Sequence, residues 1–407
     1  MAKLRFLPPE TTPDSGVLIA TRGVRAFVDG LVSTALATYL ALLGFSGTRI
    51  GVITTATLLG SGVVTVAVGL KAHAMNRQRL LQIVALVMIL TGVGFATLTA
   101  FWLILVVAVM GTMNPSSGDV SVFLPTENAL LPATVSDRFR TALYGRYALV
   151  GFVMAALGSL AAAIPARSAK AHWLAPLTSY RLVFVMYALA GLTVMLMYRK
   201  LAYEPPAPTD ARRVGLQESK AIVIRMAALF SLDSLGGGFV VSTLVIVWLH
   251  RRFDMSPAST AELFFVTGLL SGVSALIAVR IANKIGLVRT MVFTHLPANM
   301  FLMLAPFMPN VSLAVVCLVC RSFLSQMDVP VRSSYVMAVV TPAERPAAAS
   351  LTNVPRSVAS ALPPIAAGWM LDHSKFGWPL LIGGALKATY DLLLLVMFRH
   401  VRPPEEL

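Results

Sequence analysis

The sequence predicts an all-α membrane protein with twelve transmembrane helices in two pseudo-symmetric six-helix bundles. Of the 407 residues, 57% are hydrophobic and only 13% are charged, and the mean hydropathy is +0.77. A soluble globular chain carries about 25% charged residues. Apolar runs of about 18 residues or more recur along the chain, and each is long enough to cross a bilayer core of roughly 30 Å as a helix. Composition and run length therefore place the chain in a lipid bilayer.

The apolar runs divide the chain into its predicted parts. We expect the twelve spans at residues 17–44, 50–70, 80–99, 102–124, 142–164, 181–201, 221–249, 258–279, 290–308, 311–336, 348–371 and 378–399. We predict an N-terminal tail at 1–16, a first bundle at 17–202, a polar linker at 203–220, a second bundle at 221–399 and a C-terminal tail at 400–407. No short apolar core with a small-residue cleavage site precedes the first span, so that span is the expected targeting signal.

The net charge of +15 is explained by membrane topology. With the N-terminus placed inside, lysine and arginine are concentrated in the cytoplasmic ends and loops, including the linker. The positive-inside rule then predicts that both termini are cytoplasmic, and a bacterial inner membrane is the expected location. Binding to nucleic acid is not expected.

The two halves of the chain also resemble each other. At one constant shift, Ser61-Gly62 aligns with Ser271-Gly272, and Arg79 aligns with Arg289. Many secondary transporters are built from such repeats around a site near the membrane midplane.

These features together resemble the major facilitator superfamily over essentially the whole chain. The resemblance includes the basic loop after the second span of each half, which in that family reads Gly-x-x-x-Asp-Arg-x-Gly-Arg-Arg. The corresponding residues here are Gly69, His73, Arg77 and Arg79 in the first half, and Asn283, Lys284 and Gly286 in the second. His73 and Asn283 stand where the family has Asp, so the gate lock that depends on this Asp is expected to be altered.

Family members line their cavity with the first, fourth, seventh and tenth spans. The resemblance places Asp29, Asp119, Asp233 and Asp328 on those spans. A charge at the bilayer centre costs roughly 2.5–3.5 kcal/mol, so such residues usually have a function or a partner. Asp29 and Asp233 are near the middle of their spans and are therefore candidates for proton coupling or substrate contact.

A structural pairing is the alternative for each acid. Arg25 precedes Asp29 by four residues and shares its helix face, which makes an ion pair geometrically easy. Asp233 has no equally close partner in the sequence, and the Gly236–Gly238 run beside it would allow the helix to bend or open.

Arg321 is the midspan cation of the second half. Because arginine does not lose its proton in proteins, a buried arginine requires an acidic partner or an anionic ligand. Arg321 could neutralise Asp29, Asp233 or Asp328, or it could bind a carboxylate or phosphate of the solute. Asp328 could be its partner or a second coupling site.

A further charged group resembles the family's cytoplasmic gate, in which acids at the ends of the fourth and tenth spans face arginines at the starts of the fifth and eleventh. Its members are Asp119, Glu127, Arg146, Arg332 and Arg356. In the last span, Lys387 and Asp391 are four residues apart and are predicted to pair within one helix.

The sequence thus favours a secondary transporter that moves a small organic solute by alternating access, coupled to protons and directed toward export. It contains no phosphate-binding Gly-x-x-x-x-Gly-Lys-Ser/Thr loop and no clustered His/Cys ligand set, so no enzyme activity, cofactor or metal is expected. The expected partners are the small-molecule substrate, protons and the lipid bilayer, with the chain acting as a monomer. Two alternatives remain: an organic-anion or phosphate-ester carrier that uses the buried arginines, and a transporter-like membrane sensor that no longer transports.

Overall fold

The computed structural model describes residues 7–8, 10–71, 76–113, 123–202, 219–341 and 344–398. These residues are almost entirely helical, as the sequence predicts. The chain forms two compact units, the first made of residues 1–43 and 56–210 and the second of residues 44–55 and 211–407. The second helix is therefore shared, because its first residues group with the second unit.

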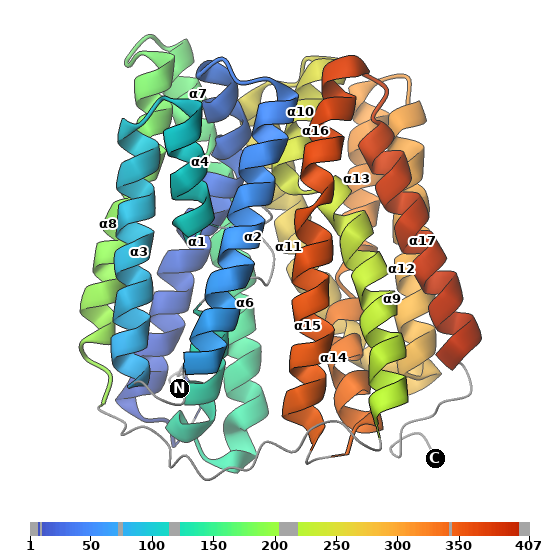
Figure 1. Ribbon diagram of the computed structural model, residues 1–407. Coiled ribbons are helices and arrows are strands. Elements are labelled where there is room, and N and C mark those ends of the chain that lie inside the picture. The colour runs from blue at the N-terminus through green and yellow to red at the C-terminus, as the bar shows by residue number, and fades with distance from the viewer. Residues whose placement is uncertain are drawn as a thin grey trace, which may run out of the picture. The chain divides into compact units, whose positions relative to one another are not determined.

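The first half of the chain supplies the following helices (Figure 1). They are α1 (Pro13–Leu42), α2 (Gly47–Lys71), α3 (Arg77–Thr97), α4 (Phe101–Met110), α5 (Leu124–Leu130), α6 (Arg140–Ala161), α7 (Ala163–Lys170) and α8 (Pro176–Tyr198). Two short 3₁₀ turns, Leu131–Thr134 and Asp137–Phe139, connect α5 to α6. Asp119 and His73 lie outside the described residues.

The second half supplies the remaining helices. They are α9 (Lys220–Phe239), α10 (Ser242–Phe253), α11 (Pro257–Ile285), α12 (Leu287–Leu304), α13 (Val311–Ser325), α14 (Asp328–Val339), α15 (Arg345–Ala361), α16 (Pro363–His373) and α17 (Trp378–Phe398). The 3₁₀ turn Ala305–Phe307 follows α12.

The two units repeat the same packing scheme. In the first unit α1 packs on α6 and α8, and α3 packs on α8. In the second unit α9 packs on α15 and α17, and α12 packs on α17. In each half, the first span thus packs on the fifth and the sixth, and the third span packs on the sixth. The repeat in the sequence is therefore also a repeat in the fold.

Three predicted spans of the second half are broken helices rather than continuous ones. The seventh span divides at Val240–Val241, the tenth at Gln326–Met327 and the eleventh at Leu362. Proline explains two of these breaks, since it lacks a backbone N–H and clashes with the carbonyl four residues earlier. Pro330 lies four residues after Gln326, and Pro363 directly follows Leu362. The break in the seventh span comes just after the glycine run.

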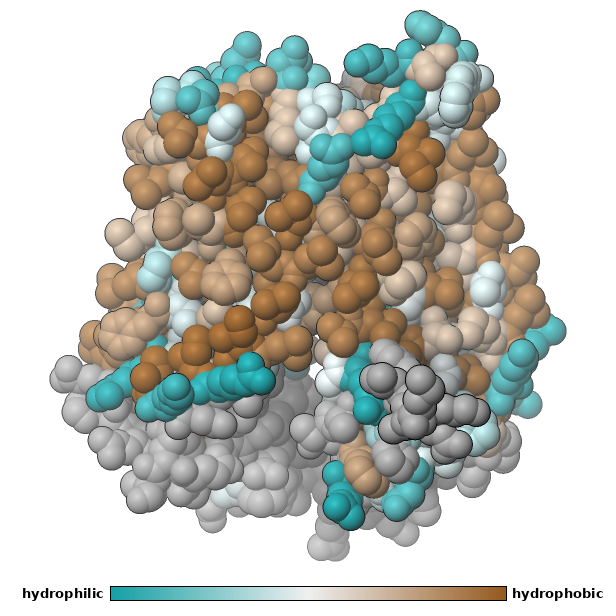
Figure 2. All heavy atoms as spheres, turned by 180° about the vertical axis from the view of Figure 1, so that it is seen from behind, coloured by the Kyte–Doolittle hydropathy of each residue, from teal (hydrophilic) through white to brown (hydrophobic). Residues whose placement is uncertain are grey.

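The helices have the length and surface of membrane spans. Within the described residues, nine helical stretches are long and apolar enough to cross a membrane. Large apolar side chains such as Trp102, Met110, Leu189 and Leu276 are exposed. On the face seen in Figure 2, apolar side chains cover the middle of the helices and hydrophilic ones gather at their ends. A surface of this kind is suited to lipid rather than water.

Glycines allow α1 and α6 to touch backbone to backbone. A Cβ atom added at Gly158 would lie 1.8 Å from the carbonyl oxygen of Phe27, and one at Gly30 would lie 2.0 Å from that of Ala155. Small residues at helix interfaces permit this kind of approach in membrane proteins. The α1–α6 contact also places Arg22 of α1 over the ring of Tyr147 on α6.

We predict that Gly158→Ala lowers the free energy of unfolding by about 1–3 kcal/mol, because the new methyl group meets a backbone oxygen that has little freedom to move. Gly145→Ala on the same helix is the matched control, since a Cβ there meets nothing within 4 Å. Thermal unfolding of the purified protein in detergent measures both variants. Equal melting temperatures for the two would contradict the close α1–α6 packing.

Candidate functional site

Glu127 is a fully buried carboxylate of the first unit, and side chains from several helices contact it. It lies in the first turn of α5, where a helix N-terminus favours negative charge. Arg25 of α1 donates to one of its oxygens and forms an ion pair with it, and Tyr147 of α6 donates to the same oxygen. The other oxygen accepts from Tyr198 at 2.6 Å and from Thr21 at 3.1 Å. One acid thus joins α1, α5, α6 and α8.

This arrangement changes the predicted roles of two residues. Arg25 pairs with Glu127 and also lies over the ring of Phe123, with 4.3 Å from its guanidinium carbon to the ring centroid. The predicted local pair between Arg25 and Asp29 is therefore not the pair that forms. Glu127, which the sequence assigns to the gate, has its hydrogen-bonding capacity filled by donors of its own unit.

Asp29, Arg22 and Arg146 are charged groups of the first unit without an opposite charge in contact. Among the described residues, none of the three forms a hydrogen bond or an ion pair. Arg22 lies over the ring of Tyr147 at 5.4 Å, and its Nε is buried without a hydrogen-bond acceptor. One terminal nitrogen of Arg146 is also buried without an acceptor. These groups remain available to a ligand.

In the second unit, the buried acid Asp233 of α9 is neutralised by two cations from other helices. Lys387 of α17 lies 2.6 Å from its Oδ1, and Arg332 of α14 lies 2.9 Å from its Oδ2. The same nitrogen of Arg332 is 3.4 Å from Asp328 Oδ2, one turn earlier on α14. Arg332, predicted for the gate, and Asp233 and Asp328, predicted for the cavity, thus form one buried cluster.

The glycine run beside Asp233 brings α17 within reach of this acid. A Cβ at Gly236 would lie 2.7 Å from the carbonyl oxygen of Gly383 and 2.8 Å from the side chain of Lys387. A Cβ at Gly238 would lie 2.4 Å from the carbonyl oxygen of Ser360 on α15. The sequence predicts that the run bends its helix, whereas its observed contribution is close packing, with the break two residues later.

The prediction that Lys387 pairs with Asp391 is wrong. Lys387 binds Asp233, while Asp391 Oδ1 is 2.9 Å from His295 Nδ1 of α12 and Asp391 Oδ2 accepts from Asn299 at 2.8 Å. His295 Nε2 in turn is 3.8 Å from Asp233 Oδ1. Sequence spacing missed His295 because its partners are distant along the chain, Asp391 of α17 by 96 residues and Asp233 of α9 by about 60.

Arg321 of α13 has no acidic partner. Among the described residues it forms neither a hydrogen bond nor an ion pair, and its Nε is buried. The break between α13 and α14 removes the helical register that would align Arg321 with Asp328. Arg356 of α15 reaches only uncharged oxygens, those of Ser234 at 3.2 Å and Asn353 at 3.3 Å.

The predicted loop motifs contribute local structure where they are described. Asn76 caps α3 by accepting from the backbone N–H groups of Gln78 and Arg79. Gly286 adopts a φ of +88° directly after α11, a conformation that favours glycine. Lys284 and Arg79 are exposed, Gly69 lies in α2, and Asn283 lies in α11.

An ionic contact of the second unit that the sequence did not reveal involves Asp372 at the end of α16. Its carboxylate caps α2, accepting from the backbone N–H groups of Gly47 and Thr48 at 2.7 Å each and from the Thr48 hydroxyl at 2.6 Å. Arg251 completes the site at 2.7 Å. Burial alone would raise the pKa of Asp372, but these hydrogen bonds lower it to about 2. The carboxylate therefore stays ionised near neutral pH.

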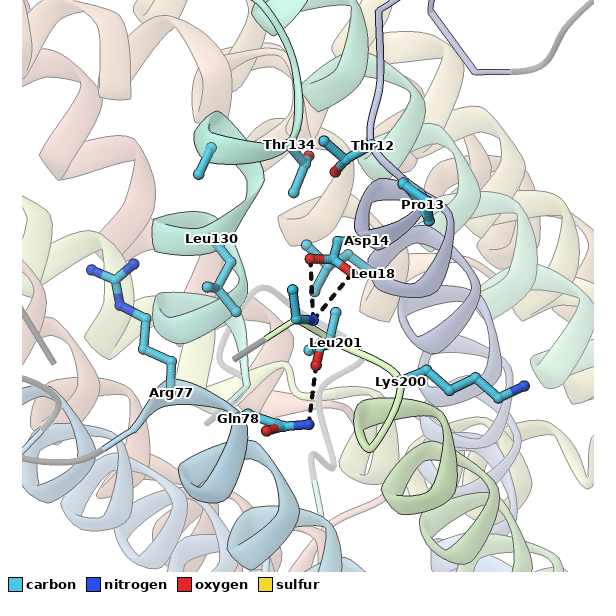
Figure 3. Close-up of a pocket in the computed structure, with 12 residues that line it drawn as sticks. Thr12, Pro13, Asp14, Leu18, Arg77, Gln78, Leu130, Thr134, Lys200 and Leu201 are labelled. Carbon is cyan, nitrogen blue, oxygen red and sulfur yellow. Dashed lines mark hydrogen bonds between the residues drawn. The ribbon is translucent and has the colours of Figure 1, made fainter. Parts of the chain in front are cut away.

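A cavity of about 480 Å³ lies at one end of the first unit (Figure 3). Two of its polar side chains, Asp14 and Gln78, form hydrogen bonds with the surrounding backbone. Asp14 accepts from the N–H of Ala202 at 3.3 Å, and the Gln78 amide donates to three carbonyls, including that of Leu201 at 3.1 Å. These contacts tie the chain beyond α8 to α1 and α3, so we interpret the cavity as structural.

We predict that Glu127→Gln destabilises the protein by about 3–5 kcal/mol, because it leaves the buried charge of Arg25 without compensation. Arg25→Met combined with Glu127→Gln recovers most of the loss, since no uncompensated charge remains. The melting temperatures of the single and the double variant are measured in detergent, with Glu262→Gln at an exposed position as the control. A double variant that is no more stable than Glu127→Gln would argue against the pair.

A second cycle tests the partner of Lys387. Lys387→Met leaves Asp233 with one cation fewer, so adding Asp233→Asn restores more stability than adding Asp391→Asn. The same melting measurement ranks the two double variants. The opposite ranking would support the intrahelical pair with Asp391.

The chain resembles known membrane proteins over most of its length. Residues 226–407 match the sequence model described as Major Facilitator Superfamily. The uncharacterized membrane protein YJR124C of Saccharomyces cerevisiae is 26% identical, and the alignment covers 95% of this chain and 94% of the yeast protein. The relative is a yeast protein, so it gives no support to a bacterial location.

Solved structures share the fold at low sequence identity. The D-xylose-proton symporter superposes with a TM-score of 0.75 at 15% identity, covering 97% of this chain and 98% of its own. The nucleoside transporter NupG gives 0.72 at 13%, covering 96% and 100%. The human organic anion transporter MFSD10 gives 0.65 at 14%, covering 94% and 100%. The chain thus shares the fold of these transporters, and residues 226–407 resemble the major facilitator superfamily in sequence.

Proposed function

We propose that this protein is a secondary transporter that moves a small organic anion across the membrane by alternating access. The observation that carries the proposal is Arg321, a cation in a predicted span that forms no hydrogen bond or ion pair with any described residue. Asp233 attracts it only from beyond ion-pair distance. An isolated charge in an apolar medium is strongly unfavourable, and arginine cannot escape the cost by losing its proton. An anionic group of the solute would supply the missing partner.

The other charged side chains without an ion pair also favour a negatively charged solute. Arg22 and Arg146 of the first unit also lack an acidic partner, and Arg356 of the second unit contacts only neutral oxygens. Asp29 is the matching acid without a partner. In each unit, arginines without an acidic partner among the described residues therefore outnumber such acids, which favours an anionic solute.

Proton coupling remains part of the proposal, with Asp29 as the main coupling acid. Asp233 was the favoured coupling residue from the sequence, but two cations already neutralise it. Asp29 has no such partner and lies midway along α1, so uptake and loss of a proton there would not first require breaking an ion pair. Its charge would then change with the proton gradient.

The finer features of the function stay predictions. The bias of basic residues supports cytoplasmic termini, export is the predicted direction, and the monomer is the predicted state. The alternative of a sensor without transport has less support, because unpaired charges in apolar helices are costly unless a ligand uses them. The names of two similar structures, a proton symporter and an organic anion transporter, agree with the proposal without identifying the solute.

We expect dicarboxylates or sugar phosphates, and not neutral sugars or nucleosides, to raise the melting temperature of the detergent-purified protein, since ligands that bind the folded state stabilise it. Arg321→Gln should weaken this effect at least tenfold in apparent affinity, because a buried charge pair contributes about 2–5 kcal/mol. Uptake of the best labelled anion into proteoliposomes should fall in parallel.

Two variants complete the transport test. Exposed Arg280→Gln on α11 should retain wild-type uptake. Asp29→Asn should retain anion binding but lose acceleration by a pH gradient. Unchanged anion uptake in Arg321→Gln would contradict the anion site, and no flux of any tested solute in a folded protein would favour the sensor.

A further inference from the structure

We infer that the charged cluster of the second unit holds one proton, carried by His295 as an imidazolium between Asp391 and Asp233. The inference deepens the proton coupling proposed above and names a second proton-binding residue for it. Nothing in the sequence pattern distinguishes His295 from the other five histidines, so the assignment rests on the contacts of the folded chain.

Both ring nitrogens of His295 face a carboxylate. Nδ1 lies 2.9 Å from Asp391 Oδ1, and Nε2 lies 3.8 Å from Asp233 Oδ1. A neutral imidazole has one N–H group and one lone pair, so one nitrogen would direct its lone pair at a carboxylate oxygen. An imidazolium presents an N–H group to each acid and removes this repulsion.

The charges within ion-pair distance lead to the same conclusion. The cluster contains three carboxylates, Asp233, Asp328 and Asp391, and two basic side chains, Arg332 and Lys387. With a neutral His295 it carries one uncompensated negative charge. One bound proton makes the cluster neutral, as a site away from water requires.

Two further cations, Arg321 and Arg356, act on Asp233 only from beyond ion-pair distance, and the other neighbours of His295 are uncharged or exposed. From α17, Tyr390 packs edge-on against the His295 ring, with 6.0 Å between centroids. The amide nitrogen of Asn299, on α12 itself, lies 3.2 Å from His295 Nδ1 and 2.8 Å from Asp391 Oδ2. Its N–H group can therefore donate to Asp391 Oδ2. The charged residues of α11, namely Glu262, Arg280 and Lys284, are exposed. Arg321 on α13 and Arg356 on α15 form no ion pair with the three acids.

The position of the proton links it to helix packing. Asp391 and Lys387 are on α17, His295 is on α12 and Asp233 is on α9. Loss of the proton would leave two carboxylates facing a neutral ring and weaken the contact among these three helices. Movement of α9 against α12 and α17 would conversely change the affinity for the proton. Proton binding and helix movement are therefore coupled through His295.

Nitrogen NMR of protein labelled at histidine, in lipid nanodiscs and without any solute, tests the inference. The His295 signal is assigned by its loss in His295→Asn, and by elimination through substitution of the other histidines should that variant fail to fold. We expect His295 to show imidazolium shifts from about pH 6 to about pH 8, the range in which an ordinary histidine becomes neutral. In Asp391→Asn the cluster is neutral without the proton, so the His295 signal should become that of a neutral imidazole in the same range.

Asp254→Asn is the matched control, because it also removes one carboxylate of the second unit but at an exposed position. It should leave the His295 signal unchanged. A neutral His295 in the wild-type protein near neutral pH, or an imidazolium that persists in Asp391→Asn, would overturn the inference. Because no solute is present, either outcome is independent of the flux measurements that decide the proposed transport.

Discussion

The structure depends on the neutralisation of carboxylates inside apolar helices. An ionised acid away from water is tolerated only with a paired charge and filled hydrogen bonds. The first unit meets this requirement at Glu127 with one arginine and three hydroxyl donors. The second unit meets it at Asp233 with a lysine and an arginine. In both units the partners come from different helices, so charge balance and helix packing are one constraint.

This constraint separates structural from functional charges. Groups that are neutralised within their own unit hold helices together, and their exchange with water or solute would first require breaking several contacts. Among the residues that the structure describes, Arg321, Arg22, Arg146 and Asp29 form no hydrogen bond or ion pair and belong to the opposite class. The distinction moves the expected solute site and the main coupling acid away from Asp233, whose cluster keeps a proton on His295, and it favours an anion over a cation as cargo.

Much of the fold follows from the sequence because apolar run length and the internal repeat are local signals. The all-helical membrane fold and its repeated packing scheme were therefore predictable. The breaks at Gln326–Met327 and Leu362 follow from Pro330 and Pro363, whose missing N–H groups were visible in the sequence. The predicted spans nevertheless treated these helices as continuous, because hydropathy averages over a proline.

The ion pairs were harder to predict because their partners are distant in the chain. Sequence spacing favours neighbours four residues apart, and it therefore suggested Arg25 with Asp29 and Lys387 with Asp391. The observed partners, Glu127 and Asp233, are separated from Arg25 and Lys387 by about a hundred residues or more. Only the folded arrangement brings Arg25 of α1 to Glu127 of α5 and Lys387 of α17 to Asp233 of α9. The close approach of α17 to α9 depends on Gly236 and Gly383, whose effect on distance the sequence does not state.

The most direct test of this account is an electron cryo-microscopy structure of the protein in lipid nanodiscs. The account predicts side-chain density that joins Asp233 to Lys387 and Arg332, with Arg321 joined to no carboxylate of the chain. Density that joins Lys387 to Asp391, or Arg321 to Asp233, would contradict the division between neutralised and available charges.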